Sequence, residues 1–256
     1  MGTPTAIRVA ESGWRRYKHT WRASLFSSFV NPVMLLLAMG IGLGSLVDRT
    51  GGPGGFAYVT WLAPGLLANI AMQTAAGESA YPVMAGMRWI KSYDAMLASP
   101  LGASDIVFGH FTWVSLRIAQ VTLIFAAVAV WLADLDVLAA FAATGASLLT
   151  GMAFIGLVTA YTAKFQSDTS LANLFRYVVV PLFLFSGVFF PISQLPSLLQ
   201  PLAWLTPLWH GVELSRWLAL GLETTFSPLA HAGYLIVVGA LGLAAAVRLF
   251  EMRLVK

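Results

Sequence analysis

The sequence predicts an all-α membrane protein with six transmembrane helices, and three observations support this fold class. Of the 256 residues, 58% are hydrophobic and only 10% are charged, whereas a soluble domain carries about 25% charged residues. Apolar runs of about 20 residues, the length needed to cross a bilayer, recur along the chain. Lys and Arg gather in the segments expected on one side of the membrane. Since backbone polar groups need partners inside hydrocarbon, the apolar runs are predicted to be helices.

The chain is predicted to start with an amphipathic helix in the membrane interface, within residues 1–27. Trp14, Tyr17 and Trp21 recur every three or four residues, with Lys and Arg between them. A single membrane domain over residues 28–256 is expected to follow. We expect the first span to stay as an anchor, because no small-residue cleavage site precedes a soluble domain. The six spans are predicted over residues 28–47, 57–77, 105–132, 138–161, 172–190 and 228–247.

The distribution of Lys and Arg predicts the orientation of these spans. With the N-terminus inside, twelve of the fifteen basic residues lie on the cytoplasmic side, Arg49 and Arg216 lie outside, and Arg117 lies within the third span. This asymmetry predicts a multi-pass membrane protein with both termini in the cytoplasm. It also accounts for the net charge of +4 without a nucleic-acid partner.

The cytoplasmic loop over residues 78–104 is predicted to contain an amphipathic helix over residues 88–98. Its apolar side chains have helical spacing, and Ser99-Pro100 is expected to end the helix. The apolar stripe consists of Trp89, Ile90, Tyr93, Met96 and Leu97. Such a helix can lie on lipid or bind a partner protein.

The external segment over residues 191–227 is predicted to form a re-entrant helical hairpin. Four prolines divide it into pieces too short to span a membrane. Its second helix is expected to start with Thr206 as N-cap and Pro207 in the first turn. His210, Glu213 and Arg216 follow at spacing three, on one side of that helix. They are expected either to form an external gate or to pack against their own chain.

Enzyme signatures are missing from the sequence. It contains no cysteine, no phosphate-binding G-x-x-x-x-G-K-[ST] loop, no H-E-x-x-H zinc motif and no G-x-S-x-G nucleophile motif. Acidic residues avoid the centres of the predicted spans, which argues against a proton-coupled carrier. We therefore expect no catalytic residue, metal or cofactor on this chain, and transport driven by a partner.

Three motifs resemble the ABC-2-type permeases of type V ABC exporters, especially the six-helix permeases of nodulation-factor and daunorubicin exporters. They are Phe185-Ser-Gly-Val-Phe-Phe-Pro191, Pro207-Leu-Trp-His-Gly211 and Tyr93-Asp-Ala-Met-Leu-Ala-Ser-Pro-Leu101. The resemblance implies two separate ATP-binding subunits, which bind ATP and Mg²⁺, and a second permease, either a copy or a sister chain. It also implies that the N-terminal helix is a connecting helix that touches the ATPase.

The resemblance also implies roles for particular residues. The inner loop would dock into the ATPase through Arg88, Trp89, Lys91, Tyr93, Asp94 and Leu97. The hairpin would close the external end of the pathway through Phe190, Pro191, His210, Glu213 and Arg216. Aromatic side chains that would line the pathway, or pack among helices and lipid, are Phe183, Phe185 and Phe189.

Two charged residues expected near the inner side of the membrane, Glu78 and Arg117, have more than one interpretation. Glu78 is expected to pair with Arg88 or Lys91, to contact the connecting helix, or to be an ordinary interfacial carboxylate. Arg117 reaches either a polar neighbour or a lipid headgroup.

The function predicted is export of an amphipathic or lipid-like substrate, such as a drug, an antibiotic or a glycolipid. The alternative within transport is a permease for a lipid-linked polysaccharide. A non-transporting membrane anchor or assembly factor is the alternative from another class, and a secondary carrier is a third.

Overall fold

The computed structural model describes residues 5–254, and the side chains of all these residues except 5, 16, 19, 20, 22–29 and 50. Residues 1–4 and 255–256 lie outside the described range, so the predicted location of the two termini concerns residues beyond it. Every regular element from residue 5 to residue 254 is helical. The predicted all-α class is therefore confirmed.

The long helices of the bundle are α1 (Thr5–Leu35), α3 (Tyr58–Met84), α5 (Ala103–Leu132), α6 (Val137–Lys164) and α11 (Pro228–Leu254). Shorter helices are α2 (Gly44–Val47), α4 (Ser92–Leu97), α7 (Asp168–Leu174), α8 (Val180–Phe185), α9 (Gln200–Trp204) and α10 (Pro207–Leu220). Short 3₁₀ turns are η2 (Asp48–Thr50), η3 (Pro53–Gly55) and η6 (Ile192–Gln194).

Among residues 5–254, three segments are π-helical, with backbone hydrogen bonds that join residues five apart along the chain. They are η1 (Leu36–Leu43), η4 (Ala85–Trp89) and η5 (Phe175–Val179). Each continues a longer helix: η1 extends α1, η4 extends α3, and η5 joins α7 to α8. π-Helical turns occur mostly as single-turn insertions in α-helices, and frequently at functional sites.

Five helical segments within the described residues are long and apolar enough to cross a membrane. They are Val30–Val47, Ala103–Leu132, Val137–Lys164, Asp168–Phe185 and Pro228–Leu254. The predicted fifth span, over residues 172–190, ends five residues early. The helix stops at Phe185 because Gly187 adopts a left-handed φ of 81° and turns the chain.

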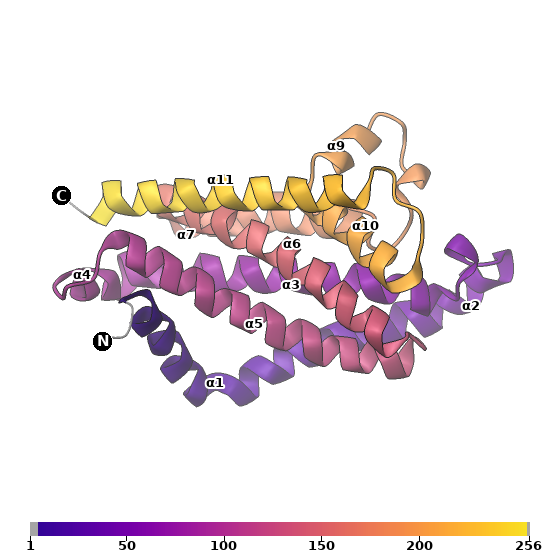
Figure 1. Cartoon of the computed structure of the whole chain (residues 1–256), viewed down its shortest axis with the longest axis horizontal. Helices are drawn as coiled ribbons and strands as arrows, with labels where there is room; N and C mark the ends of the chain where they lie inside the picture. The colour runs from indigo at the N-terminus through magenta and orange to yellow at the C-terminus, as the bar shows by residue number, and fades with distance from the viewer. Residues whose placement is uncertain (1–4, 255–256) are drawn as a thin grey trace.

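The second predicted span lies within α3, which is longer than expected and continues to Met84. α3 is not among these five segments, because its polar residues Asn69, Gln73, Thr74 and Glu78 lower its hydropathy. α3 nevertheless lies inside the bundle, because it packs against α5, α6 and α10. Figure 1 shows it running lengthwise behind α5 and α6.

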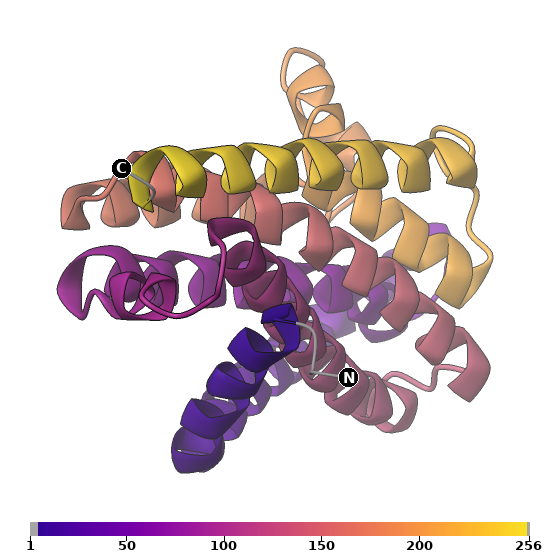
Figure 2. The ribbon, with the colours of Figure 1, turned by 60° about the vertical axis from the view of Figure 1, so that its left-hand side comes forward.

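Helix α6 occupies the middle of the bundle and packs against α11, α3, α10 and α5. Its contact with α11 is made by backbone. A Cβ atom at Gly156 would lie 2.5 Å from the Leu243 nitrogen, and one at Gly242 would lie 2.7 Å from the Leu157 nitrogen. Figure 2 shows the two helices side by side along the bundle. Glycine thus sets the separation of α6 and α11.

Helix α1 bends and leads from an N-terminal stretch on α5 to the stretch that ends in η1 (Figure 1). Close approach at two glycines fixes the N-terminal stretch. A Cβ at Gly13 would lie 2.7 Å from the Trp113 ring, and one at Gly109 would lie 2.5 Å from Val9. The amphipathic helix and the first span therefore form one continuous helix.

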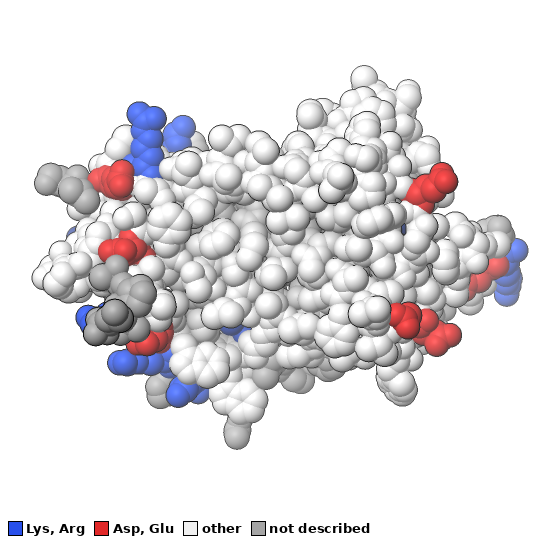
Figure 3. Space-filling view, in the orientation of Figure 1, with Lys and Arg blue, Asp and Glu red and all other residues white. Residues whose placement is uncertain are grey.

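Charge is unevenly distributed along the bundle (Figure 3). Lys and Arg side chains gather at the end that carries α4, the start of α1 and the end of α11, whereas the opposite end shows mainly Asp and Glu. The start of α1 and the end of α11 thus lie at the same end. We call this the basic end, and the opposite one the hairpin end.

Candidate functional site

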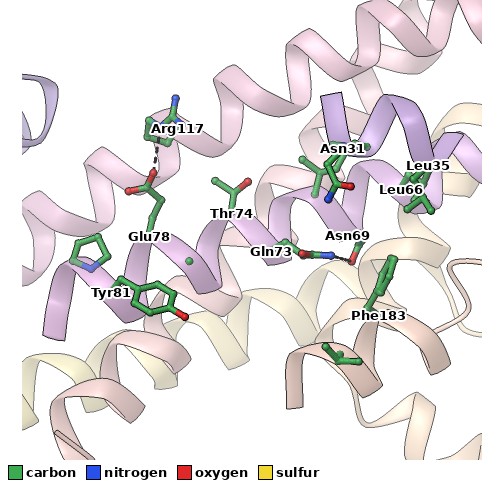
Figure 4. A pocket seen from close by; sticks show the side chains of 15 residues that line it. Asn31, Leu35, Leu66, Asn69, Gln73, Thr74, Glu78, Tyr81, Arg117 and Phe183 are labelled. Atoms are coloured by element: carbon green, nitrogen blue, oxygen red, sulfur yellow. Dashed lines mark hydrogen bonds and ion pairs between the residues drawn. The ribbon is translucent and has the colours of Figure 1, made fainter. Parts of the chain in front are cut away.

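An open cavity of about 730 Å³ lies between α1, α3 and α8. Its lining is part apolar and part polar, and most of the polar groups come from one face of α3. Figure 4 shows Asn31 of α1 and Phe183 of α8 on either side of that face. Its lining includes Asn31, Leu35, Asn69, Gln73, Glu78 and Phe183. Pockets of this size accept small molecules or parts of larger ones.

Glu78 borders this cavity and pairs with Arg117 of α5. The Arg117 Nε lies 3.5 Å from the Glu78 Oε1, and Arg117 is almost completely buried. Arg117 also donates from Nη1 to the Gln120 Oε1 at 2.7 Å, while Gln120 donates to the Tyr17 hydroxyl at 3.0 Å. Its guanidinium lies 4.1 Å from the centre of the Tyr17 ring.

These contacts decide between the interpretations of the two charged residues. Glu78 pairs with Arg117, and no pairing with Arg88 or Lys91 is found among the described contacts. Arg117 reaches polar neighbours, and through Gln120 it is linked to Tyr17 of the N-terminal stretch. The carboxylate at the cavity is thereby connected to α1.

The loop over residues 78–104 contains a shorter helix than the sequence predicts. η4 carries α3 on to Trp89, Lys91 adopts a left-handed φ of 55°, and α4 covers only Ser92–Leu97. The prediction of a helix over residues 88–98 is therefore wrong. The break arises because α3 continues through the predicted start, so the apolar stripe is divided between two elements.

The residues predicted to contact the ATPase differ in their accessibility. Tyr93 is buried, with its ring 5.6 Å from that of Phe250, and Leu97 packs against the same cluster. Lys91 and Asp94 are exposed. Ile90, which separates η4 from α4, is 74% exposed. The loop therefore presents Ile90 and its charged neighbours, whereas Tyr93 and Leu97 stabilise the chain's own fold.

Arg88 and Trp89 connect the loop over residues 78–104 to the loop over residues 162–171. The Arg88 Nη1 donates to the Gln166 carbonyl at 2.6 Å, and the Trp89 Nε1 donates to the Asp168 Oδ1 at 3.2 Å. Both side chains are exposed despite these bonds. These two bonds therefore join this loop to the start of α7.

At the hairpin end, Arg216 is buried in its own chain. Its Nη2 donates to the Val188 carbonyl at 2.9 Å and its Nε to the Trp61 carbonyl at 3.3 Å. The guanidinium lies 3.4 Å from the centre of the Trp61 ring. Arg216 thus fastens α10 to α3 and to the turn after α8, as the own-chain alternative expects.

His210 also contacts its own chain. Its Nδ1 lies 2.9 Å from the Nδ1 of His231 in α11, its Nε2 lies 2.9 Å from the Trp204 carbonyl, and its ring stacks on Tyr234. A carbonyl only accepts, so the Nε2 of His210 carries a proton and donates it. In the neutral pair, the His231 Nδ1–H then donates to His210. Burial, and secondarily the neighbouring His231, lowers the pKa of His210 to about 4.

Glu213 lies apart from Arg216 although both belong to α10. Its Oε2 accepts from the Thr225 backbone nitrogen at 3.2 Å and from the Thr225 hydroxyl at 3.3 Å. No ion pair between Glu213 and Arg216 is among those of the described residues. The three polar residues of the stripe therefore diverge: His210 contacts α11, Glu213 contacts the chain before α11, and Arg216 contacts α3.

The predicted start of α10 is confirmed, since Thr206 is its N-cap and Pro207 its first residue. The first half of the hairpin forms only η6 and the five-residue α9. Figure 2 shows this part projecting from the bundle beyond α11. Phe190 packs against a hydrophobic cluster formed by Ile192, Leu195, Ala203 and Trp209. The half-exposed Pro191 precedes η6.

The three pathway phenylalanines lie in different surroundings. Phe183 lines the cavity, and its ring is 4.8 Å from that of Phe189. The Phe189 carbonyl accepts from the Tyr58 hydroxyl at 2.8 Å. Phe185 instead lines a separate apolar groove of about 320 Å³ between α8 and α9. The structure therefore brings only Phe183 and Phe189 together.

Sequence reasoning missed the polar face of α3. Asn69 and Gln73 are four residues apart, a spacing that places these two on one side of a helix, whereas Glu78, five residues further, is rotated by about 140° from Gln73. This pattern could have indicated the cavity. The partners Trp61 and His231 had no comparable signal, because each lies far in sequence from the residue that it contacts. Among the described residues, no group of three or more His, Asp or Glu side chains could hold a metal ion.

Comparison with known proteins finds a matching family and several relatives. Residues 8–220 match the family model described as ABC-2 type transporter. The chain is 30% identical to Nodulation protein J of Rhizobium meliloti (strain 1021), over 89% of this chain and 85% of that protein. It is 32% identical to Nodulation protein J of Rhizobium leguminosarum bv. trifolii, over 88% and 86%. Against the inner membrane transport permease YadH of Escherichia coli (strain K12), the identity is 26% over 86% and 88%.

Proposed function

The chain belongs to the ABC-2 type transporter family, and on this premise we propose that it is the permease subunit of an ATP-driven exporter. It moves an amphipathic or lipid-like substrate outward across the bacterial inner membrane. This location agrees with the name of the inner membrane permease to which the chain is similar. Family membership implies association with an ATP-binding subunit.

The cavity between α1, α3 and α8 is the observation that carries the export proposal. It holds about 730 Å³ at the depth of the spans and combines polar with apolar lining. A membrane anchor has no use for polar side chains at this depth, because they are costly in lipid unless they are paired or face water. An amphiphile would use both kinds of surface.

In this proposal the chain crosses the membrane six times, through the five apolar segments and through α3. The basic end is cytoplasmic, since inner loops carry an excess of Lys and Arg. The hairpin over residues 191–227 then lies at the external side as a re-entrant element. Its polar anchors, Arg216 and His210, hold it in place as the outer closure of the pathway.

The loop with Ile90 contacts the ATP-binding subunits, of which there are two, and the permease acts as a pair with a copy or a sister chain. ATP and Mg²⁺ are bound by the ATP-binding subunits, and hydrolysis takes place there. The contacts of Arg88 and Trp89 with the second inner loop support transmission of movement from the docked loop into α7 and α8.

Co-expression with the ATP-binding subunit encoded nearest to this chain tests the proposal. The expected result is a complex that survives purification and hydrolyses ATP only when both subunits are present. If the chain inserts normally but forms a complex with no such subunit, the membrane-anchor alternative is favoured.

Orientation is tested separately, with single cysteines in a chain that has none of its own. A cysteine at Gly52 should react with an impermeant reagent in intact cells, and a cysteine at Lys91 should not. The opposite pattern would invert the proposed topology.

A further inference from the structure

The polar lining of the cavity carries no unbalanced charge among the described side chains that form it. The lining includes one carboxylate, that of Glu78, and one guanidinium, that of Arg117. The Arg117 Nε lies 3.5 Å from the Glu78 Oε1. Figure 4 shows this pair at one end of the polar face of α3. Arg117 is engaged further by Gln120 and by the Tyr17 ring. A charged headgroup that entered here would lose water and would meet a counter-charge that is already paired.

Neutral hydrogen-bonding groups form the rest of this polar face. The Gln73 Nε2 donates to the Asn69 Oδ1 at 3.4 Å, and both belong to α3 (Figure 4). This bond leaves Gln73 with one N–H and a carbonyl oxygen, and Asn69 with its amide N–H groups. Asn69 is buried at the base, whereas Gln73 is exposed to the cavity. Asn31 faces them from α1. The lining therefore both donates and accepts.

The remaining wall is apolar and is supplied by α1, α3 and α8. Leu35 comes from α1, Leu66 and Ile70 from α3, and Phe183 from α8. Apolar surface of this kind accommodates an alkyl chain or a ring, while the amides orient a polar group.

We infer that the cavity selects amphiphiles with an uncharged headgroup that bears hydroxyl or amide groups, and that Gln73 is the residue that sets this preference. Hydroxyls and amides both donate and accept, which matches the free groups of Gln73 and Asn69. Phosphate-bearing and ammonium-bearing amphiphiles are rejected, since neither meets a free opposite charge. The inference rests on the proposed function in that it treats this cavity as the substrate site.

The test uses the full-length permease in lipid nanodiscs and three probes with the same dodecyl chain. The probes are dodecyl glucoside, dodecyl phosphate and dodecyltrimethylammonium, each below its micelle concentration. Binding is measured by the ligand-induced rise in Tm, which reports affinity for the folded state. The glucoside is expected to bind about tenfold more tightly than either charged probe. A tenfold difference in Kd is about the contribution of one well-placed hydrogen bond.

Charge variants of Gln73 give the decisive comparison, because a new preference cannot come from misfolding. Gln73→Lys should shift the preference toward dodecyl phosphate by about tenfold, and Gln73→Glu should shift it toward dodecyltrimethylammonium by a similar factor. Gln73→Leu should weaken binding of the glucoside. The matched control is Gln194→Lys, an exposed glutamine in the external hairpin, which should leave the order of the three probes unchanged.

The inference is overturned if the unmodified chain binds a charged probe most tightly, if it binds none of the three, or if the Gln73 variants keep the original order. Because binding is measured on the permease alone, this outcome is independent of ATPase assembly. Failure to form a complex with an ATP-binding subunit would count against the proposed function and would leave the binding result to stand by itself.

Discussion

Arg216 and Trp61 are 155 residues apart in the chain, yet the guanidinium of Arg216 lies 3.4 Å from the centre of the Trp61 ring and its Nε donates to the Trp61 carbonyl. Trp61 thus contacts the charge of Arg216 through its ring and accepts a hydrogen bond from it through its carbonyl. The contact joins the hairpin helix α10 to α3. It makes the position of the hairpin depend on a helix that also lines the cavity.

Arg216→Met should lower the stability of the protein by about 2 kcal/mol or more. The substitution leaves the carbonyls of Trp61 and Val188 without donors and removes the cation–π contact. Thermal unfolding in detergent measures the change. Arg216→Lys keeps the charge but not the planar fork of donors, so its Tm should lie between those of the other two proteins. A normal Tm for Arg216→Met, together with impaired export, would assign Arg216 to gating rather than to anchoring.

Glu78→Gln should destabilise the protein by about 1–3 kcal/mol, because it leaves the buried Arg117 without its carboxylate. The value is set below that of a fully buried pair, since the Glu78 side chain is 29% exposed. The double variant Glu78→Gln/Arg117→Gln should recover much of the lost Tm. If the double variant is no more stable than the single one, the pair does not compensate charge.

Gly156→Ala should destabilise the protein, whereas Gly145→Ala should be neutral or slightly stabilising. Both glycines belong to α6, but a Cβ at Gly156 would lie 2.5 Å from the Leu243 nitrogen, and one at Gly145 meets nothing within 4 Å. Alanine favours a helix over glycine by about 0.5–1 kcal/mol, so only the contact with α11 reverses the sign. Equal Tm values for the two variants would contradict this backbone contact.

Ile90→Glu should abolish or strongly weaken co-purification with the ATP-binding subunit without lowering the Tm of the isolated permease. Ile90 is 74% exposed in the inner loop, so a charge there costs the fold little but disrupts an apolar contact with a partner. Leu229→Glu is the control, because Leu229 is 84% exposed at the hairpin end of α11. If both variants bind the subunit normally, the docking surface lies elsewhere.

Acidification should weaken the hairpin through His210. Its pKa is lowered to about 4 in the folded protein, whereas an unfolded histidine titrates near about 6.5. Between these values the unfolded chain binds a proton that the folded chain excludes, so stability falls as the pH drops from about 6.5 to about 4 and is unaffected above that window. Tm measured at pH 7.5 and 5 should therefore differ less in His210→Gln than in the unmodified protein.

The elements that could be predicted from sequence are those with a local signal. Thr206 and Pro207 determine the start of α10 by their own chemistry, and long apolar runs identify five spans. α3 was harder to delimit, because Gln73 and Glu78 interrupt its apolar character while neighbouring helices shield them. Its continuation through residue 89 removed the expected start of the loop helix.

The contacts of the candidate site were less predictable, because they join residues that are distant in sequence. Arg117 finds Glu78 on another helix, and His210 finds His231 across the hairpin. The burial of Tyr93 depends on Phe250, near the end of the described chain. An amphipathic stripe indicates that some apolar face is covered, but it does not distinguish a cover supplied by the same chain from one supplied by a partner.

The π-helical segments have a consequence for helix register. η1, η4 and η5 belong to the three helical stretches that lead into or out of the cavity walls, namely α1, α3 and α7–α8. A π-turn accommodates one residue more than the α-turn it replaces. Passing that residue along the helix rotates everything beyond it by about 100° and shifts it by about 1.5 Å. Each π-helical segment thus offsets the side chains beyond it relative to an uninterrupted α-helix, while the backbone hydrogen bonds remain inside the helix, which hydrocarbon surroundings demand.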